Sequence, residues 1–422
     1  MNPQLCTTAS ADPIDITSSR FVDKVLFFLL FSGPPKFRLR DPNASLDIAI
    51  DWVVMLHIIV WVVAGLWVFN KLWLSKLHFG TKISSLEKVS MFFVACLSVS
   101  IVFSDGPALT AFKIYQLFIT ITFLFVYSRD YGVQACFDGI YFGSAALCIA
   151  DVLAAIFAPS MVFGESEFGS LRFRGDLIAQ TGIVGALALV LLLTSSHKRS
   201  GWATAVGGTL FGSVLLFSLM RTAYLAFVVF LLLALWKKPE IRLLKRIARF
   251  AALVLPVAVI VGALAQLEEY RPAESIWTLS DRLGLWTYLV DIMWSTSRWF
   301  GLGYFSASRI YGPEYNPGLG TAHSVFIEVL AGGGVVSFTV LLILVTMLIR
   351  QSLRLLQQVA SPTNFIAVGL LVLTLSFLLV GGELEAEPAG FTFWTLVVTI
   401  PILVRSSSKT PALSAWIPSQ TK

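Results

Sequence analysis

The sequence predicts an all-α polytopic membrane protein with about 12 transmembrane helices and one long hydrophilic loop between the ninth and the tenth. The first observation is composition: of the 422 residues, 56% are apolar and 13% are charged, and the mean hydropathy is +0.80. Soluble domains carry roughly 25% charged residues. The second is that apolar runs near the roughly 20 residues needed to cross a bilayer recur from end to end. The third is that the charge of the connecting loops alternates along the chain.

Each expected span is an apolar run bounded by charged or turn-forming residues. In order, the runs are 22–32, 47–69, 88–104, 107–127, 133–158, 177–195, 202–219, 222–236, 249–265, 324–349, 364–381 and 389–404. The first is shorter than the roughly 17 to 25 residues of real spans. Asp12 and Asp15 lie where a signal peptide would have a basic start, so we expect the N-terminus to be retained.

Two sets of loops differ in charge. The basic set contains Lys71, Lys76, Lys82, Lys88, Arg129, Lys198, Arg199, Lys237, Lys238, Arg242, Lys245, Arg246, Arg249, Arg350, Arg354, Arg405 and Lys409. The other set contains Asp105, then Glu165, Glu167, Arg172 and Arg174, then the long loop, and then Glu383, Glu385 and Glu387. Because cytoplasmic loops are enriched in Lys and Arg, the basic set predicts the cytoplasmic side. Lys36, Arg38 and Arg40 fit this topology badly, because it puts them outside.

The chain is interpreted as one integral membrane domain over 1–422, with the long loop 266–322 as a subdomain within it and 406–422 as a polar cytoplasmic tail. The net charge of +6 comes mainly from the short basic loops and gives no indication of nucleic-acid binding.

The long loop ends at His323, and its cations are four arginines and no lysine, namely Arg271, Arg282, Arg298 and Arg309. Apolar residues recur in it at helical spacing, at Leu279, Leu283, Trp286, Val290, Met293 and Trp294. Such a stripe suits a helix on the membrane surface, and a helix packed within the loop is the alternative. Arg282 and Trp286 would share one side of it.

Arg221 is the one charge between the basic loops that flank Gly201 and Trp236. Two full spans would need roughly 40 residues, so we expect a shorter hairpin that leaves Arg221 recessed beneath the outer surface. A charge inside a membrane bundle usually marks a partner or a pathway. The fork of the guanidinium suits a phosphate, and snorkelling or pairing with an acidic residue is the alternative.

Arg172 and Arg174 precede the expected helix after Asp176, on the side opposite the basic loops. Contact with phosphate would explain them, and salt bridges with Glu165, Glu167 or Asp281 are the alternative.

His323 is expected in the first turn of the helix through Phe326 and Leu330, at the mouth of the bundle. A neutral imidazole there could accept a proton from a sugar hydroxyl, and a capping or packing role is the alternative. Glu328, five residues on, would turn partly away from it. No second histidine is close enough in sequence to suggest a metal site.

Two other clusters have simpler interpretations. The alternate spacing of Glu383, Glu385 and Glu387 is typical of a solvated loop more than of an acid–base pair. The run of three glycines from Gly332 to Gly334 lies inside an expected span, where it predicts close helix packing or a kink.

Taken in order, these motifs resemble the O-antigen ligase and polymerase superfamily of bacterial membrane proteins. The segments that carry the resemblance are Asp281-Arg282 with Trp286, Trp299-Phe-Gly-Leu-Gly-Tyr-Phe305, and His323-Ser-Val-Phe-Ile-Glu-Val-Leu-Ala-Gly-Gly-Gly334. Ser218-Leu-Met-Arg-Thr-Ala-Tyr224 and Arg172-Phe-Arg-Gly175 are similar to the upstream arginine segments of the family. Ser324 stands where the family often has asparagine, and Gln180-Thr181 where it often has Pro-Asn.

The resemblance implies a metal-independent, inverting glycosyltransferase without a cofactor, in the bacterial inner membrane with its active face in the periplasm. The donor would be a glycan on undecaprenyl pyrophosphate, and the acceptor another glycan or lipid A–core. By the same resemblance, Arg221 and Arg282 would bind the pyrophosphate and His323 would activate or orient the acceptor hydroxyl. Arg174, Arg172 and Trp286 would contact the substrate at the rim.

Two questions remain open at the level of sequence. The residues do not distinguish a polymerase of O-antigen or exopolysaccharide from an O-antigen ligase. A flippase or transporter of polyprenyl-linked glycan without chemistry is the alternative from another class, and a non-catalytic assembly scaffold is a third. A transporter would place ionisable groups near the middle of the bilayer, whereas the candidate charges here gather at the outer face.

Overall fold

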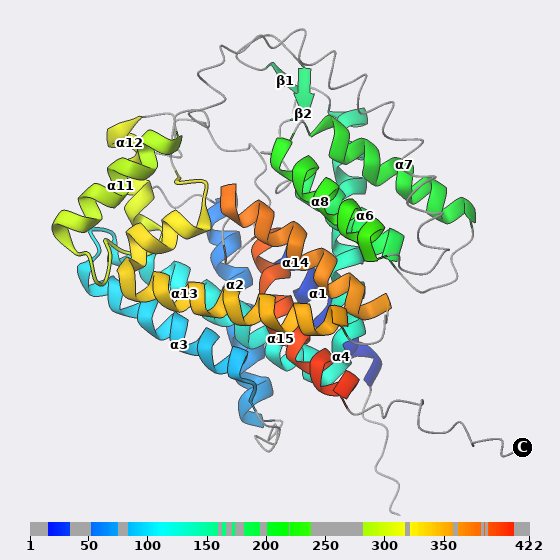
Figure 1. Ribbon diagram of the computed structural model, residues 1–422, viewed down its shortest axis with the longest axis horizontal. Coiled ribbons are helices and arrows are strands. Elements are labelled where there is room, and N and C mark those ends of the chain that lie inside the picture. Colours follow the sequence, from blue (N-terminus) through cyan, green and yellow to red (C-terminus); the bar gives the residue numbers. More distant parts are fainter. Residues whose placement is uncertain are drawn as a thin grey trace, which may run out of the picture.

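The computed structural model describes a helical bundle with a smaller helical unit at one end (Figure 1). It describes residues 16–33, 52–74, 83–158, 163–165, 171–173, 181–194, 201–218, 220–237, 282–316, 321–357, 362–380, 384 and 387–408. Within these residues the helices are α1 Ile16–Ser32, α2 Trp52–Leu74, α3 Ser85–Val99 with the 3-10 turn η2 Ser100–Phe103, α4 Pro107–Phe157, α6 Thr181–Thr194, α7 Gly201–Phe217, α8 Arg221–Lys237, α11 Arg282–Thr296, α12 Ser306–Tyr315, α13 Val325–Gln357, α14 Pro362–Val380 and α15 Pro388–Ser408.

The apolar runs of the sequence coincide with these helices, and the expected run 249–265 lies outside the described residues. Five helices of the described part are long and apolar enough to cross a membrane: α2, α3 with η2, α4, α13 and α15. The chain is therefore a helical membrane protein, and the total of about 12 spans stays a prediction. α1 is longer than its expected run and begins at Ile16.

The predicted all-α class is confirmed, and one pair of short strands accompanies the helices. Strands β1 Phe163–Glu165 and β2 Leu171–Phe173 form an antiparallel pair in which Gly164 lies opposite Arg172. Helical periodicity could not reveal it, because three-residue strands are too short for a period-2 pattern to stand out.

Gly132 divides α4 into two helical stretches where the sequence predicts a loop between two spans. Its backbone has φ 83° and ψ 172°, a region that is essentially restricted to glycine. The two stretches together form the centre of the bundle, because α1, α2, α6 and α15 all pack on α4.

The second stretch of α4 receives the aromatic side chains of α1. A methyl group on Gly139 would lie 2.6 Å from the ring of Phe27, and one on Gly143 would lie 2.7 Å from the ring of Phe31. Both rings also contact Phe391 of α15, edge to face, with centroids 4.9 and 5.8 Å away. These contacts fix α1 in the core although its apolar run is short.

Around this centre, α6, α7 and α8 form one group, and α14 joins α6 and α8 to α13 and α15. α13 packs in turn against α3, α11 and α12, so that it connects the bundle to the unit at its end. Figure 1 places α11 and α12 together at one edge of the molecule and the β1–β2 pair above α6, α7 and α8.

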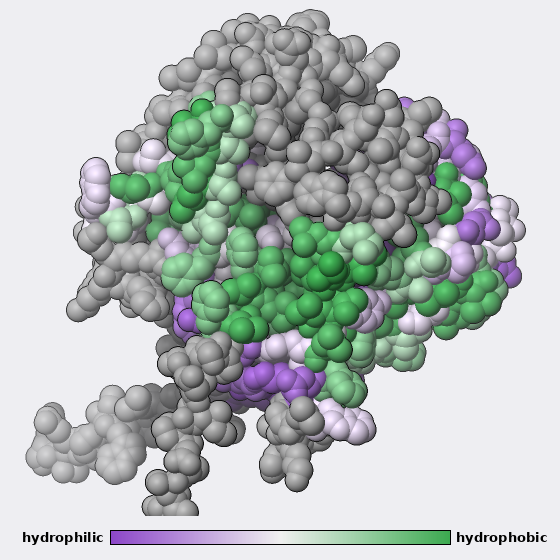
Figure 2. All heavy atoms as spheres, turned by 180° about the vertical axis from the view of Figure 1, so that it is seen from behind, coloured by the Kyte–Doolittle hydropathy of each residue, from purple (hydrophilic) through white to green (hydrophobic). Residues whose placement is uncertain are grey.

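Members of the predicted cytoplasmic set of charges gather at one end of the bundle. Glu87 closes a capping box with Ser84 at the start of α3, and its carboxylate lies 3.7 Å from Arg129 at the turn in α4. Arg405, in the last turn of α15, lies within electrostatic range of Arg129. Figure 2 shows hydrophobic side chains across the middle of the rear face and hydrophilic ones along its lower and right-hand edges, as expected of a protein that crosses a bilayer.

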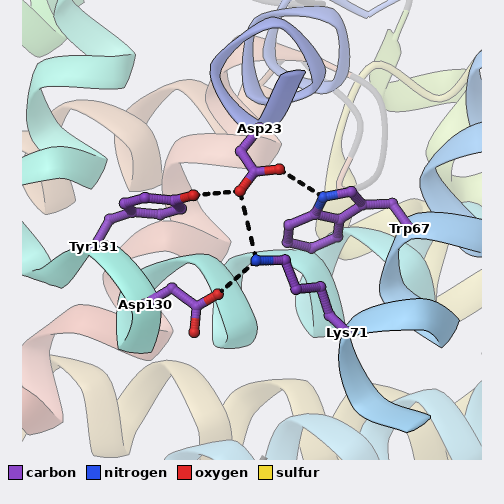
Figure 3. Close-up of polar contacts among 5 residues, drawn as sticks. All are labelled: Asp23, Trp67, Lys71, Asp130 and Tyr131. Carbon is purple, nitrogen blue, oxygen red and sulfur yellow. Dashed lines mark hydrogen bonds and ion pairs between the residues drawn. The ribbon is translucent and has the colours of Figure 1, made fainter. Parts of the chain in front are cut away.

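A second polar cluster at the turn in α4 joins three helices through Asp23 of α1 (Figure 3). The Asp23 carboxylate is 2% exposed and accepts hydrogen bonds from the Trp67 indole at 2.7 Å and from the Tyr131 hydroxyl. Lys71 lies 3.6 Å from the same carboxylate and 3.0 Å from Asp130. The cluster thus holds the N-terminal helix to α2 and α4 with a buried charge whose neighbours are all donors or cations.

We expect Asp23→Asn to lower the free energy of unfolding by about 1.5–3 kcal/mol, because the amide nitrogen presents hydrogens to groups that also donate. Thermal unfolding in detergent micelles measures the change. Asp138→Asn is the control, since Asp138 lies on α4, the helix that carries Tyr131, and accepts a hydrogen bond from Gln134 at 2.9 Å near the surface. The free energy of unfolding of Asp138→Asn should change by no more than about 0.5 kcal/mol. Equal losses in the two variants would contradict the role of Asp23 in holding α1 to α2 and α4.

Candidate functional site

The smaller unit at the end of the bundle, formed by α11 and α12, is called the outer unit here. It is held to α13 by direct contact between two backbone segments, residues 298–303 and 331–336, which we call the glycine contact. Leu302 N–H donates to the Ala331 carbonyl at 3.0 Å, and Gly303 N–H donates to the Gly332 carbonyl at 2.9 Å. Two bonds run the other way, from the N–H groups of residues 335 and 336 to the carbonyls of residues 298 and 299, at 3.0 and 3.2 Å. The pairing resembles a short strand ladder between a turn and a break in a helix.

Glycine is required on both sides of this contact. A Cβ atom on Gly301 would lie 2.3 Å from the Gly332 carbonyl oxygen, and one on Gly334 would lie 2.4 Å from the Trp299 carbonyl carbon. Gly334 also has φ 70° and ψ −177°, which breaks the helical path of α13 there. The prediction that the glycine run allows a kink and close packing is confirmed.

α11 packs as a loop helix against α12 and α13. Its buried residues are Leu285, Leu289 and Met293, which lie with Leu302 and Ala331 in a small apolar cluster. The stripe predicted from the sequence is therefore only partly the buried face, because Leu283 and Trp294 are 45% and 59% exposed. The reason is that α12 and α13 contact α11 from a direction that periodicity alone does not define.

His323 lies two residues before α13 begins, and the prediction that it stands in the first helical turn is wrong. Its φ of 51° is left-handed, a conformation that costs a non-glycine residue about 1–2 kcal/mol. Only His323 and Phe305 have positive φ among the non-glycine residues that the structure describes. The half-buried imidazole therefore projects from a turn and not from a helix face.

The residue before His323 is held by hydrogen bonds on both sides. The Ala322 carbonyl accepts from the Trp286 indole at 2.7 Å, and the Ala322 N–H donates to the Glu328 carboxylate at 3.0 Å. Ser308 of α12 donates to the same oxygen of Glu328 at 2.5 Å. α11 and α13 thus hold Ala322, the residue next to His323, directly, and α12 joins them through Glu328.

Arg282 is the first residue of α11, one turn before Trp286, and is half-buried. Burial lowers the pKa of its guanidinium. A cation in the first turn of a helix opposes the helix dipole, which favours anions there.

Arg221 is likewise the first residue of its helix, α8, and its side chain lies outside the described residues. Both helices of the hairpin have 17 residues, so each is about 25 Å long, less than the roughly 30 Å of the hydrocarbon layer. The turn between them packs on α6, since a Cβ atom on Gly182 would lie 2.6 Å from the Ser218 hydroxyl and 2.7 Å from Met220. The short hairpin agrees with the prediction, and the recessed side chain of Arg221 stays a prediction.

The other expected residues have mixed outcomes. Arg172 lies in β2, with its side chain outside the described residues, and Arg174 is outside them altogether. Glu387 is 4% exposed at the start of α15, where its carbonyl accepts from Phe391 N–H, so its assignment to a solvated loop is wrong. Glu383 and Glu385 lie outside the described residues. Within the part that the structure describes, no three His, Cys, Asp or Glu side chains gather as a metal site requires.

The structure adds residues that sequence patterns did not single out. Phe305 is 4% exposed, and its ring is contacted by Lys113 at 3.7 Å and by Arg309 at 5.0 Å from the centroid. This cation–π contact accounts for Arg309 without a phosphate. Ser308 carried no signal in the sequence, and Glu328 carried only its spacing from His323.

Hydroxyl groups bind the outer unit to the start of α4. Ser306 of α12 lies 2.7 Å from the Ser104 hydroxyl and 2.8 Å from the Thr110 hydroxyl. Next to them the Tyr311 hydroxyl donates to Asp105. The hydrogen bond to Asp105 and burial raise the pKa of Tyr311 from 10.0 to about 12.

Arg282 and Trp286 thus lie on α11, and the Trp286 indole donates to the carbonyl of Ala322, the residue before His323. Arg221 begins a helix of the other group, which α14 connects to α13.

A family model described as O-antigen ligase matches residues 206–342. The matched stretch contains Arg221, Arg282, His323 and the glycine contact, whereas Arg172 and Arg174 precede it. The resemblance to the O-antigen ligase and polymerase superfamily is confirmed over this stretch. Together with the apolar helices, it indicates glycan transfer of the ligase or polymerase type at a membrane. Nothing in it favours the transporter alternative, and no curated protein matches the chain.

Gly334→Ala should destabilise the protein more than Gly132→Ala, although the two glycines have nearly the same backbone angles. Both variants take on strain of about 1–3 kcal/mol. Only in Gly334→Ala does the new Cβ atom collide with backbone atoms, because nothing lies within 4 Å of a Cβ atom on Gly132. Unfolding midpoints and membrane levels of the two variants measure the difference, and equal losses would show that the glycine contact carries no stability of its own.

Tyr311 should stabilise the protein at neutral pH and lose this contribution between pH 10 and pH 12, because its folded pKa lies above the ordinary value. The unfolding midpoint of Tyr311→Phe should therefore lie below that of the wild type at pH 8 and approach it as the pH rises to 12. In Asp105→Asn the loss should move to lower pH, since no carboxylate then opposes the phenolate. A difference between wild type and Tyr311→Phe that is constant up to pH 12 would contradict the pairing.

Proposed function

We propose that this protein transfers a glycan from undecaprenyl pyrophosphate to a sugar hydroxyl at the periplasmic face of the bacterial inner membrane. The observation that carries the proposal is that Arg221 and Arg282 each begin a helix and that His323 directly precedes the N-cap of a third. All three lie in the stretch that matches the O-antigen ligase family model.

The arginines suit the donor because its leaving group is an anionic pyrophosphate. Helix N-termini present free N–H groups and positive potential to an anion, and a guanidinium adds two parallel donors. Charge grows on the pyrophosphate as the glycosidic bond breaks, so preorganised donors stabilise the transition state more than the ground state. Arg172, Arg174 and Trp286 would contact the donor at the rim of the same site.

His323 suits the acceptor. Its neutral imidazole takes the proton of the attacking hydroxyl as the new C–O bond forms at the anomeric carbon. The bond from that carbon to the pyrophosphate oxygen breaks, and the electron pair leaves with the pyrophosphate. A single displacement of this kind inverts the anomeric carbon and needs no metal or cofactor.

The charge pattern supports the sidedness of the proposal. Lys71, Arg129 and Arg405 lie at one end of the bundle, which the positive-inside rule assigns to the cytoplasm together with the tail 406–422. The unit formed by α11 and α12 belongs to the opposite side. In a chain of about 12 spans, residues 266–322 would form the periplasmic subdomain there. There the donor keeps its polyprenyl tail among membrane lipids while its pyrophosphate reaches the site.

The acceptor distinguishes two versions of this function, both of which use the same donor and the same base. A polymerase adds to another lipid-linked glycan, and a ligase adds to lipid A–core. The sugar products of a deletion strain decide between them. Single repeats on lipid or on the acceptor indicate the polymerase, whereas full-length chains left on lipid indicate the ligase.

His323→Ala should reduce transfer by roughly 10²–10⁴-fold, because the acceptor hydroxyl loses its base. The measurement is the polymeric glycan made by a deletion strain that carries the variant, normalised to the level of the protein in the membrane. His197→Ala is the matched control, since His197 lies in a basic loop that the topology puts on the cytoplasmic side. Unchanged glycan length and attachment in His323→Ala would exclude the catalytic role.

A further inference from the structure

We infer that Glu328 is a positioning residue that holds His323 in its working orientation through the backbone of Ala322. The inference rests on the proposed function, because it takes His323 as the group that meets the acceptor. Glu328 acts on His323 through the neighbouring residue. Its Oε1 accepts hydrogen bonds from Ala322 N–H at 3.0 Å and from the Ser308 hydroxyl at 2.5 Å.

The left-handed backbone of His323 needs such support. A residue in this region persists there only where its surroundings over-determine it. The adjoining Ala322 is fully buried, its carbonyl is held by Trp286 and its N–H by Glu328. With both ends of this residue fixed, the direction in which the imidazole leaves the turn is fixed as well.

The position of Glu328 in α13 explains how one side chain can do this. Ser324 is the N-cap, as its carbonyl accepts from the backbone N–H of Glu328 at 2.9 Å. The carboxylate therefore lies at the positive end of the helix dipole, where an anion is favoured even though the residue is only 5% exposed. From there it turns back past the N-cap to reach Ala322, as the glutamate of a capping box does over a shorter distance.

Ser308 extends this support to the outer unit. It is 1% exposed in the first turn of α12, next to the glycine contact, so the carboxylate joins α12 to the turn of His323. Docking of α11 and α12 and orientation of His323 thereby depend on the same oxygen atom. A direct proton-transfer role would instead require that oxygen to face the acceptor.

Two substitutions at Glu328 separate positioning from charge. Glu328→Ala removes the acceptor, and we expect transfer to fall by about 10–100-fold, the effect of a misplacement near 1 Å. Glu328→Gln keeps an amide oxygen that can accept the same two bonds, and we expect it to keep most of the activity. Loss in Glu328→Gln as large as in Glu328→Ala would overturn the inference, because a charged or proton-transferring carboxylate would then be needed.

Hydrogen exchange gives a readout that does not depend on the reaction. In Glu328→Ala the amide of Ala322 should exchange about tenfold faster, whereas in Glu328→Gln it should stay protected. Glu87→Ala is the matched control, because Glu87 is also 5% exposed and accepts from a backbone N–H, that of Ser84, at 2.5 Å at the start of α3. It should leave the exchange of Ala322 unchanged. Unchanged exchange in Glu328→Ala would overturn the inference.

A double-mutant cycle tests whether Glu328 acts through His323. In the His323→Ala background, Glu328→Ala should reduce transfer no further, since the group that it positions is absent. A further loss of 10–100-fold there would overturn the inference. Full transfer in His323→Ala alone would defeat the proposed function, while the exchange of Ala322 would still decide whether Glu328 holds the turn.

Discussion

The glycine contact between residues 298–303 and 331–336 is the constraint on which the outer half of the molecule depends. Backbone amides and carbonyls bond directly across it, so no side chain can come between the two segments. Gly301 and Gly334 are the positions where a Cβ atom would collide with backbone. Because the contact sets where α12 starts and where α13 bends, it also sets how Ser308 and Glu328 can meet.

The two ends of the bundle are built differently. At the end with the turn in α4, opposite charges are satisfied within the protein, as in the cluster around Asp23. At the other end, positive groups stand at helix N-termini, where Arg221 and Arg282 add to the potential of the helix dipole. Charges paired within the protein hold helices together, whereas positive potential at the start of a helix suits an anionic ligand. This contrast is the physical basis for the proposed glycan transfer from a lipid pyrophosphate.

Much of the fold could be predicted from the sequence, because a bilayer imposes a length and an apolar surface on each helix. The break at Gly132 and the one at the glycine run of α13 could also be predicted from the sequence, because each interrupts an apolar run. The helical placement of His323 was wrong because its left-handed backbone is imposed by hydrogen bonds from α11 and α13. The burial of Glu387 and the buried face of α11 likewise depend on neighbours that are remote in sequence.

By itself, the sequence determined the class of the protein and predicted the sides of its loops and the candidate residues, because hydropathy, charge and motif order are properties of the chain. Only the tertiary structure decided how those residues are held. The support of His323 comes from Trp286, Ser308 and Glu328 on three different helices. Their hydrogen bonds depend on distances between helices, and those distances are set by the packing of the glycine contact and not by spacing along the chain.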